Sequence, residues 1–98
     1  MPKTLRAGTF YKFNRLTGDY EVGNEIAEAV AQMEVRLLHD VYTLRPSDAK
    51  SLAKKVSPFR PKWHPAHGRN FFPHYYPDGG KFGHIFYGKR GEDFEPRD

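Results

Sequence analysis

Four of the five histidines of this 98-residue chain lie between residues 64 and 87, among seven aromatic residues and a single acid, Asp78. They are His64, His67, His74 and His84. Imidazole is the side chain whose unperturbed pKa lies nearest neutrality, so it can accept or donate a proton at physiological pH. A histidine cluster with little acid around it is suited to proton transfer beside a phosphate group.

Positive charge is concentrated in the same half of the chain. Residues 41–91 contain ten Lys and Arg against two acids, whereas residues 1–40 contain five Lys and Arg against six acids. A basic region that coincides with histidines and aromatic rings favours a polyanionic partner, nucleic acid above all. A solvated basic surface without a partner is the alternative.

Length and composition limit the classes of protein. We expect residues 1–98 to form one domain, with 89–98 as a charged tail that could be flexible. The absence of cysteine excludes a disulfide framework and a cysteine-ligated zinc site. No apolar run is long enough to be a secretion signal or a membrane span, so we expect a soluble domain or one cut from a longer protein.

Periodicity predicts the elements that must position the histidines. Residues 9–13 favour a strand, and apolar residues at 22, 26, 30, 33, 37 and 41 predict a helix over about 24–41. His39 falls off that apolar stripe and is expected at the surface. A second helix should begin at Pro46 and bury Ala49, Leu52, Ala53 and Val56.

The C-terminal half reads as a loop followed by a hairpin. Prolines at 58, 61 and 65 with Gly68 predict a loop over 57–70, and the runs 71–76 and 82–87 predict two strands. The expected fold is α+β. It has an N-terminal strand and two helices, followed by a small twisted antiparallel sheet that ends in a C-terminal β-hairpin.

The length of the hairpin loop decides which residues face each other. A three-residue loop at 78–80 sets His74 opposite His84 and Tyr76 opposite Phe82, on one face of the sheet. Tyr87 would point to the other face. A two-residue loop would shift the register by one and separate the histidines.

Two neighbouring imidazoles suit metal-independent cleavage of RNA. One removes the proton of the 2′-hydroxyl and the other protonates the leaving 5′-oxygen. We expect His74 and His84 to form this pair, with His67 as a replacement member and Tyr76 or Tyr87 orienting the phosphate. The expected phosphate- and RNA-binding residues are the cations Lys62, Arg69 and Lys81 and the base-stacking ring of Trp63.

Several other interpretations stay open. The His64 and His67 spacing resembles a metal-binding pair, but the proline between them argues against a helix that presents both rings, so no metal or cofactor is expected. A metal-dependent nuclease, a non-catalytic nucleic-acid-binding module and an aromatic protein-interaction surface remain alternatives. The histidines could also be ordinary residues at the edge of a core.

The C-terminal third resembles the ends of the C-terminal toxin domains of bacterial polymorphic toxin systems, including contact-dependent inhibition and Rhs-type effectors. The resemblance covers about residues 43–88 and is carried by the segments KWHPAHG, PHYYP and GHIFYG, beginning at Lys62, Pro73 and Gly83. It implies a small nuclease, commonly an RNase, neutralised by an acidic immunity protein. It also implies active-site roles for His67, His74 and His84. Such an effector is secreted or delivered and acts in the cytoplasm of the target cell; otherwise we expect a cytoplasmic protein.

Overall fold

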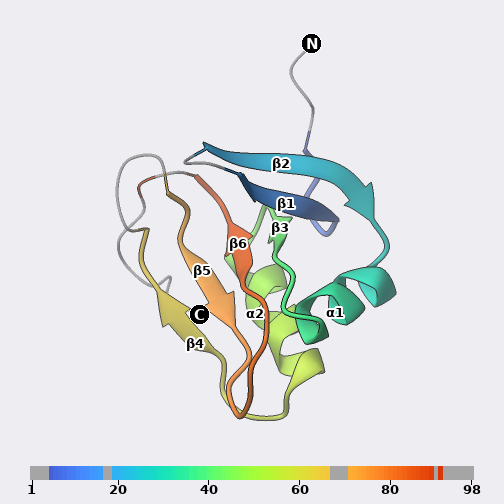
Figure 1. Ribbon diagram of the computed structural model, residues 1–98, viewed down its shortest axis with the longest axis vertical. Helices are drawn as coiled ribbons and strands as arrows, with labels where there is room; N and C mark the ends of the chain where they lie inside the picture. The colour runs from blue at the N-terminus through green and yellow to red at the C-terminus, as the bar shows by residue number, and fades with distance from the viewer. Residues whose placement is uncertain (1–4, 17–18, 67–70, 90, 92–98) are drawn as a thin grey trace.

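The structure is a computed structural model that describes residues 5–16, 19–66, 71–89 and 91. These residues form six strands and two helices (Figure 1). The elements, in chain order, are β1 (Phe10–Leu16), β2 (Asp19–Ile26), α1 (Glu28–Arg36), β3 (Val41–Thr43), α2 (Pro46–Val56), β4 (Lys62–His64), β5 (His74–Tyr76) and β6 (Ile85–Tyr87).

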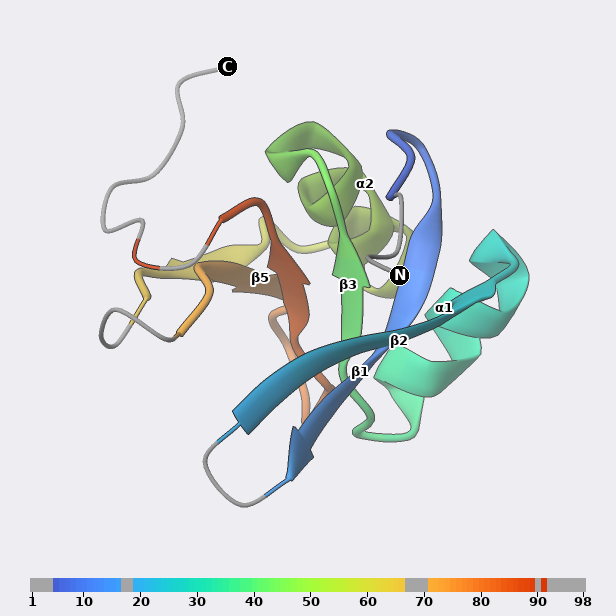
Figure 2. The same ribbon diagram turned by 90° about the horizontal axis from the view of Figure 1, so that it is seen from above.

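The strands form one mixed sheet in the order β2-β1-β3-β6-β5-β4. Neighbouring strands are antiparallel except β3 and β6, which are parallel. The α+β prediction is therefore confirmed, but the expected arrangement, in which the sheet follows both helices, is wrong. β3 lies between the two helices in sequence and near the middle of the sheet in space, because it pairs with both β1 and β6. Figure 2 shows β1 and β2 crossing the direction of β5, so the sheet is strongly curved.

The helix predicted over 24–41 is shorter than expected. Val22 and Ile26 belong to β2, where they pair with residues of β1, so the apolar pattern there continues a strand rather than a helix. Within α1 the buried residues are Ala31 and Val35, whereas Met33 and Leu37 of the predicted stripe are exposed. The pairing of β2 with β1 thus overrides the helical spacing of the apolar residues in this segment.

The second helix, α2, begins at Pro46 and buries Ala49, Leu52 and Ala53 as predicted. These residues share a core with side chains from α1 and from the facing side of the sheet, among them Tyr75, Ile85 and Tyr87. Both helices therefore cover the same face of the sheet (Figures 1 and 2). Among the described residues no helix is long and apolar enough to cross a membrane.

The opposite face of the sheet carries a second, aromatic cluster. It contains Tyr11, Phe13, Tyr42, Phe72 and Phe86, all buried. Phe13 and Phe86 stack with ring centroids 4.4 Å apart, although they come from distant parts of the chain. Offset and edge-to-face packing of such rings stabilises this face, which neither α1 nor α2 covers and which we call the helix-free face.

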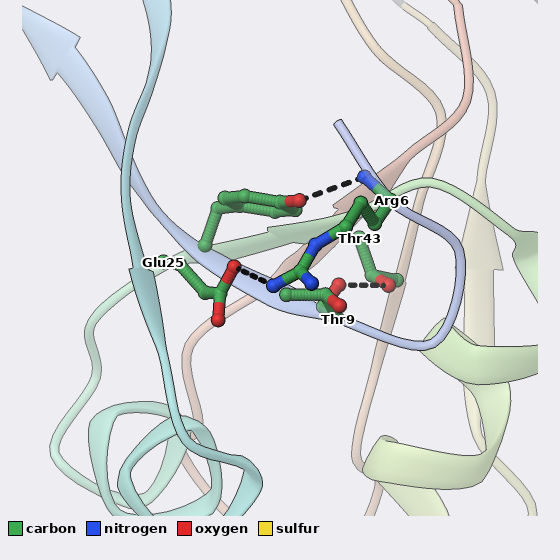
Figure 3. Close-up of polar contacts among 5 residues, drawn as sticks. Arg6, Thr9, Glu25 and Thr43 are labelled. Carbon is green, nitrogen blue, oxygen red and sulfur yellow. Dashed lines mark hydrogen bonds and ion pairs between the residues drawn. The ribbon is translucent and has the colours of Figure 1, made fainter. Parts of the chain in front are cut away.

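Polar contacts join the N-terminal segment to this sheet (Figure 3). The Arg6 backbone N–H donates to Tyr11 Oη at 2.8 Å, and its guanidinium pairs with Glu25 of β2. Hydrogen bonding to the Glu25 carboxylate raises the pKa of the Arg6 guanidinium. Thr43 Oγ1 donates to the backbone oxygen of Thr9 at 2.8 Å, which connects β3 to the residue just before β1.

Candidate active site

The loop predicted over 57–70 contains the edge strand β4. It pairs antiparallel with β5, so that Lys62 faces Tyr76, Trp63 faces Tyr75 and His64 faces His74. Prolines flank this strand on both sides, and proline is tolerated beside an edge strand because no neighbour needs its missing N–H. His64, which the sequence analysis set aside, thereby lies directly beside His74.

The register predicted for the C-terminal hairpin is wrong by two residues. β5 and β6 pair His74 with Phe86 and Tyr75 with Ile85. The connection is longer than three residues because the chain before β6 is held elsewhere. The N–H of Gly83 donates to Val35 O at 2.8 Å, and the N–H of His84 donates to Asp40 Oδ1 at 2.9 Å. A two-residue shift leaves each side chain on its original face.

This register produces two rows of side chains across the helix-free face. One row runs from His64 through His74 to Phe86. Because residues two apart in a strand share a face, the second row places Lys62 beside Tyr76, and extending the register places His84 on the other side of Tyr76. We call His64, His74, Tyr76 and His84 the histidine cluster.

Ring contacts connect all four members of the histidine cluster. The centroids of His74 and His84 are 4.8 Å apart and the rings are nearly parallel. His74 also lies 5.4 Å from His64, and Tyr76 lies 5.1 Å from His64 and 5.2 Å from His84. Tyr76 Oη and His64 Nε2 are 3.3 Å apart, within hydrogen-bond distance. The sequence predicted that His74 and His84 lie together, and they do so as diagonal neighbours.

Burial separates the histidines into two kinds. Only 3% of His74 is exposed, and its Nδ1 lies 3.4 Å from the backbone oxygen of Phe72. His64 is exposed, whereas His84 and Tyr76 are partly buried. The cluster therefore presents His64, Tyr76 and His84 to solvent, with His74 beneath them. The backbone of His84 is fixed from both sides, because its carbonyl also accepts from the N–H of Val41 at 3.0 Å.

Two of the other predicted site residues, Tyr87 and Trp63, lie away from this cluster. Tyr87 is fully buried on the helix-covered face, where its Oη accepts a hydrogen bond from Trp63 Nε1 at 3.0 Å. Trp63 packs against the same core, so neither ring faces the histidines. Lys81 is exposed in the connection between β5 and β6. His67 and Arg69 lie outside the described residues.

The structure also shows where His39 and the α2 lysines lie. His39 is at the surface as predicted and pairs with Glu34, Nδ1 to Oε2 at 2.8 Å. The α2 lysines lie on the side of the sheet away from the cluster, where Lys55 pairs with Glu28. Within the described part of the chain, no three His, Asp or Glu side chains are arranged to hold a metal ion.

His64 is the candidate that sequence reasoning missed. The available signal was Trp63, a strand-favouring residue between two short loops, in a segment whose prolines suit an edge strand. This signal could not be interpreted without knowing the partner strand, because a segment of three residues is too short to show the alternation of apolar and polar side chains that marks a strand.

Comparison with protein-family models, with curated proteins and with solved structures gives no significant match. The geometry of the histidine cluster is therefore the basis on which a function can be proposed.

Proposed function

We propose that this protein is a ribonuclease that cleaves RNA by general acid–base catalysis at the histidine cluster, in the manner of a bacterial toxin domain. The observation that supports this proposal is the contact of three imidazoles and one phenol on a helix-free face beside Lys62. Proton transfer in both directions requires two groups that titrate near neutrality, and imidazoles meet that requirement.

The proposed roles follow the burial of the rings. His64 is exposed, whereas His84 is partly buried and its Nδ1 is covered by protein, so Nε2 is the atom of His84 proposed to exchange a proton with the substrate. One of these two imidazoles takes the proton of the 2′-hydroxyl as the 2′-oxygen attacks phosphorus. The other, protonated, gives its proton to the 5′-oxygen as the P–O5′ bond breaks. The products are a 2′,3′-cyclic phosphate and a 5′-hydroxyl.

His74 is proposed as a positioning residue rather than as a group that touches RNA. Its ring contacts both His64 and His84 and is almost fully buried. Exchange of a proton with the substrate needs a hydrogen-bonding distance of about 3 Å. A buried ring in contact with both acid–base residues instead limits the rotamers they adopt, and this orientation contributes to catalysis.

Tyr76 and Lys62 are proposed to hold the phosphate. Tyr76 lies between His64 and His84, so its hydroxyl can donate to a phosphate oxygen that both imidazoles reach. Lys62 is exposed and stands beside Tyr76 in the same row of the sheet. Its ammonium can offset the extra negative charge that develops on the phosphorane oxygens.

The proposed natural inhibitor is an acidic immunity protein that covers this face. The chain carries a net charge of +4, and the exposed cation Lys62 stands beside the histidine cluster on this face. An acidic partner would be attracted to such a surface and would compete with RNA for it.

A non-catalytic RNA-binding module is the second candidate, and the burial of His74 favours it. If the cluster is a packed structural element, RNA binds through Lys62 and the exposed rings without turnover. A nuclease that depends on a metal is the third, and chelation separates it from the first.

The test is incubation of the purified protein with a labelled single-stranded RNA in excess EDTA. We expect cleavage to 2′,3′-cyclic phosphate ends, with a bell-shaped dependence of kcat/KM on pH. His64→Gln and His84→Gln should each lower kcat by at least about a hundredfold, the usual contribution of an acid–base group. Cleavage that requires added metal would support the metal-dependent nuclease, and RNA binding without cleavage would support the binding module.

The matched control is His39→Gln, which removes an exposed imidazole outside the cluster. It should leave kcat unchanged. Equal activity of all three variants and the wild type would refute the assigned roles.

A further inference from the structure

A second feature lies next to the histidine cluster, along the edge strand β4. It is a cavity of about 390 Å³ lined by Phe59, Arg60, Pro61, Lys62, Trp63 and Asp78, which we call the edge pocket. Its lining residues come from the segment between α2 and β4, from β4 and from the connection between β5 and β6. The two connecting segments lie side by side at the bottom of Figure 1, and the Phe59 ring contacts Gly79 between them. Lys62 links the two sites, because it lines the pocket and stands beside Tyr76.

The pocket combines aromatic surface with one acceptor and two cations. Phe59 is 58% exposed, so its ring has free surface to offer a ligand. The Trp63 ring is partly buried and its orientation is set by the hydrogen bond to Tyr87. Asp78 can only accept hydrogen bonds when ionised, whereas Arg60 and Lys62 can only donate.

Loop contacts hold the aromatic and acidic residues in one unit. The Phe59 ring packs on the backbone of Gly79, where a Cβ would come within 2.5 and 2.7 Å of two ring atoms. Ser57 Oγ donates to the backbone oxygen of Asp78 at 2.6 Å, which ties the two loops together. Phe59 and Asp78 are therefore preorganised relative to each other, and preorganisation lowers the entropic cost of binding.

These groups match the parts of one nucleotide. An exposed aromatic ring stacks a nucleobase, and cations bind its phosphate. Among the bases, guanine offers a carboxylate two adjacent donors, N1–H and the 2-amino group. Adenine and cytosine offer one amino group on that edge, and uracil offers only N3–H.

We propose that the edge pocket is a subsite that binds a guanine base of single-stranded RNA, by stacking on Phe59 and by two hydrogen bonds to Asp78. The inference rests on the proposed function in one respect. It places that guanine next to the phosphate at the histidine cluster, with Lys62 between the two.

The first test measures binding without turnover. Guanosine, adenosine, cytidine and uridine 3′-monophosphates are titrated into the full chain, with amide chemical shifts as the readout. We expect the guanosine nucleotide to bind at least about tenfold more tightly than the others, since a hydrogen bond to a charged group is worth that much. The affinity for inosine 3′-monophosphate, which lacks the 2-amino group, should lie between that for the guanosine nucleotide and those for the other three.

Two variants test the assigned contacts. Asp78→Asn should remove the preference for guanosine, whereas Glu21→Gln on β2 makes the same charge change at the opposite edge of the sheet and should keep it. Phe59→Ala should lower the affinity for each of the four nucleotides by about tenfold, the contribution of one stacked ring. The control is Leu37→Ala, which shortens a side chain that is also 58% exposed and should leave these affinities unchanged.

The outcomes separate the two proposals. Equal affinity for all four nucleotides, or a preference that survives Asp78→Asn, overturns the guanine subsite even if RNA is cleaved. Selective binding of guanosine by a protein that cleaves no RNA supports the subsite and refutes the ribonuclease. If both proposals hold, a labelled RNA with a single guanine is cut next to it, and Asp78→Asn abolishes that selectivity.

Discussion

Replacement of Gly83 by alanine tests the contact that sets the position of His84. A Cβ at residue 83 would overlap the carbonyl oxygen of His39 and lie 2.6 Å from its carbonyl carbon. Both are backbone atoms in the turn between α1 and β3, so no side-chain rotation relieves the overlap. The two segments must separate by roughly 1.5 Å or more to reach ordinary contact distance.

The expected loss of stability follows from two effects of that separation. Overpacking of this kind costs about 1–3 kcal/mol. The hydrogen bond from the Gly83 N–H to Val35 O, now 2.8 Å, would break and leave a buried donor, which costs about 1–3 kcal/mol more. We expect the free energy of unfolding to fall by about 2–6 kcal/mol, the sum of the two effects. In a domain of this size that corresponds to a drop in Tm of at least about 8 °C.

Thermal unfolding followed by circular dichroism measures this change, with Gly80→Ala as the matched control. The three atoms nearest to a Cβ at residue 80 all belong to the Phe82 ring, at 3.1 Å or more, so a shift of a few tenths of an ångström in one side chain relieves the contact. The free energy of unfolding of the control should stay within about 0.5 kcal/mol of the wild type, the ordinary range for a surface substitution. A Gly83→Ala protein that melts within about 4 °C of the wild type would refute the close approach of these segments.

Three further predictions concern the roles assigned to single residues. His74→Phe should keep the fold but lower kcat for RNA about tenfold or more with KM nearly unchanged, because misplaced acid–base groups slow the chemical step; a change in KM alone would contradict a positioning role. Tyr87→Phe should lower the free energy of unfolding by about 1–2 kcal/mol, since it leaves a tryptophan N–H without its acceptor; loss of RNA cleavage by the folded variant would place this residue in the site after all. Lys62→Met should reduce the slope of log Kd for RNA against log salt by about one, whereas Lys54→Met on the other side of the sheet should not; equal slopes for the two variants would remove Lys62 from the interface.

The sequence was sufficient to predict an element where the residues of that segment determine its structure by themselves. The start of α2 was predictable because Pro46 suits the first turn of a helix and the apolar residues after it follow one stripe. Strand character was likewise readable around His74 and Ile85, and the alternation of side chains placed Tyr87 on the face opposite the histidines. The coincidence of histidines, rings and positive charge also needed no structure.

Pairing between distant segments decided the rest. The pattern at Val22 and Ile26 fits a helix and a strand equally, and only the partner β1 selects the strand. The hairpin register depended on Gly83 and His84 being held by the α1–β3 turn, a contact across more than forty residues that no local turn rule contains.

The histidine cluster illustrates the same division between sequence and tertiary structure. The sequence alone determined which residue types are available, and it predicted that His74 and His84 share a face only for a hairpin register of one parity. Only the fold decided that β4 adds His64 beside them, that His74 lies buried beneath, and that Phe59 and Asp78 meet at the edge of the sheet. The physical reason is that burial and cross-strand neighbours arise from contacts between segments, whereas periodicity is a property of one segment.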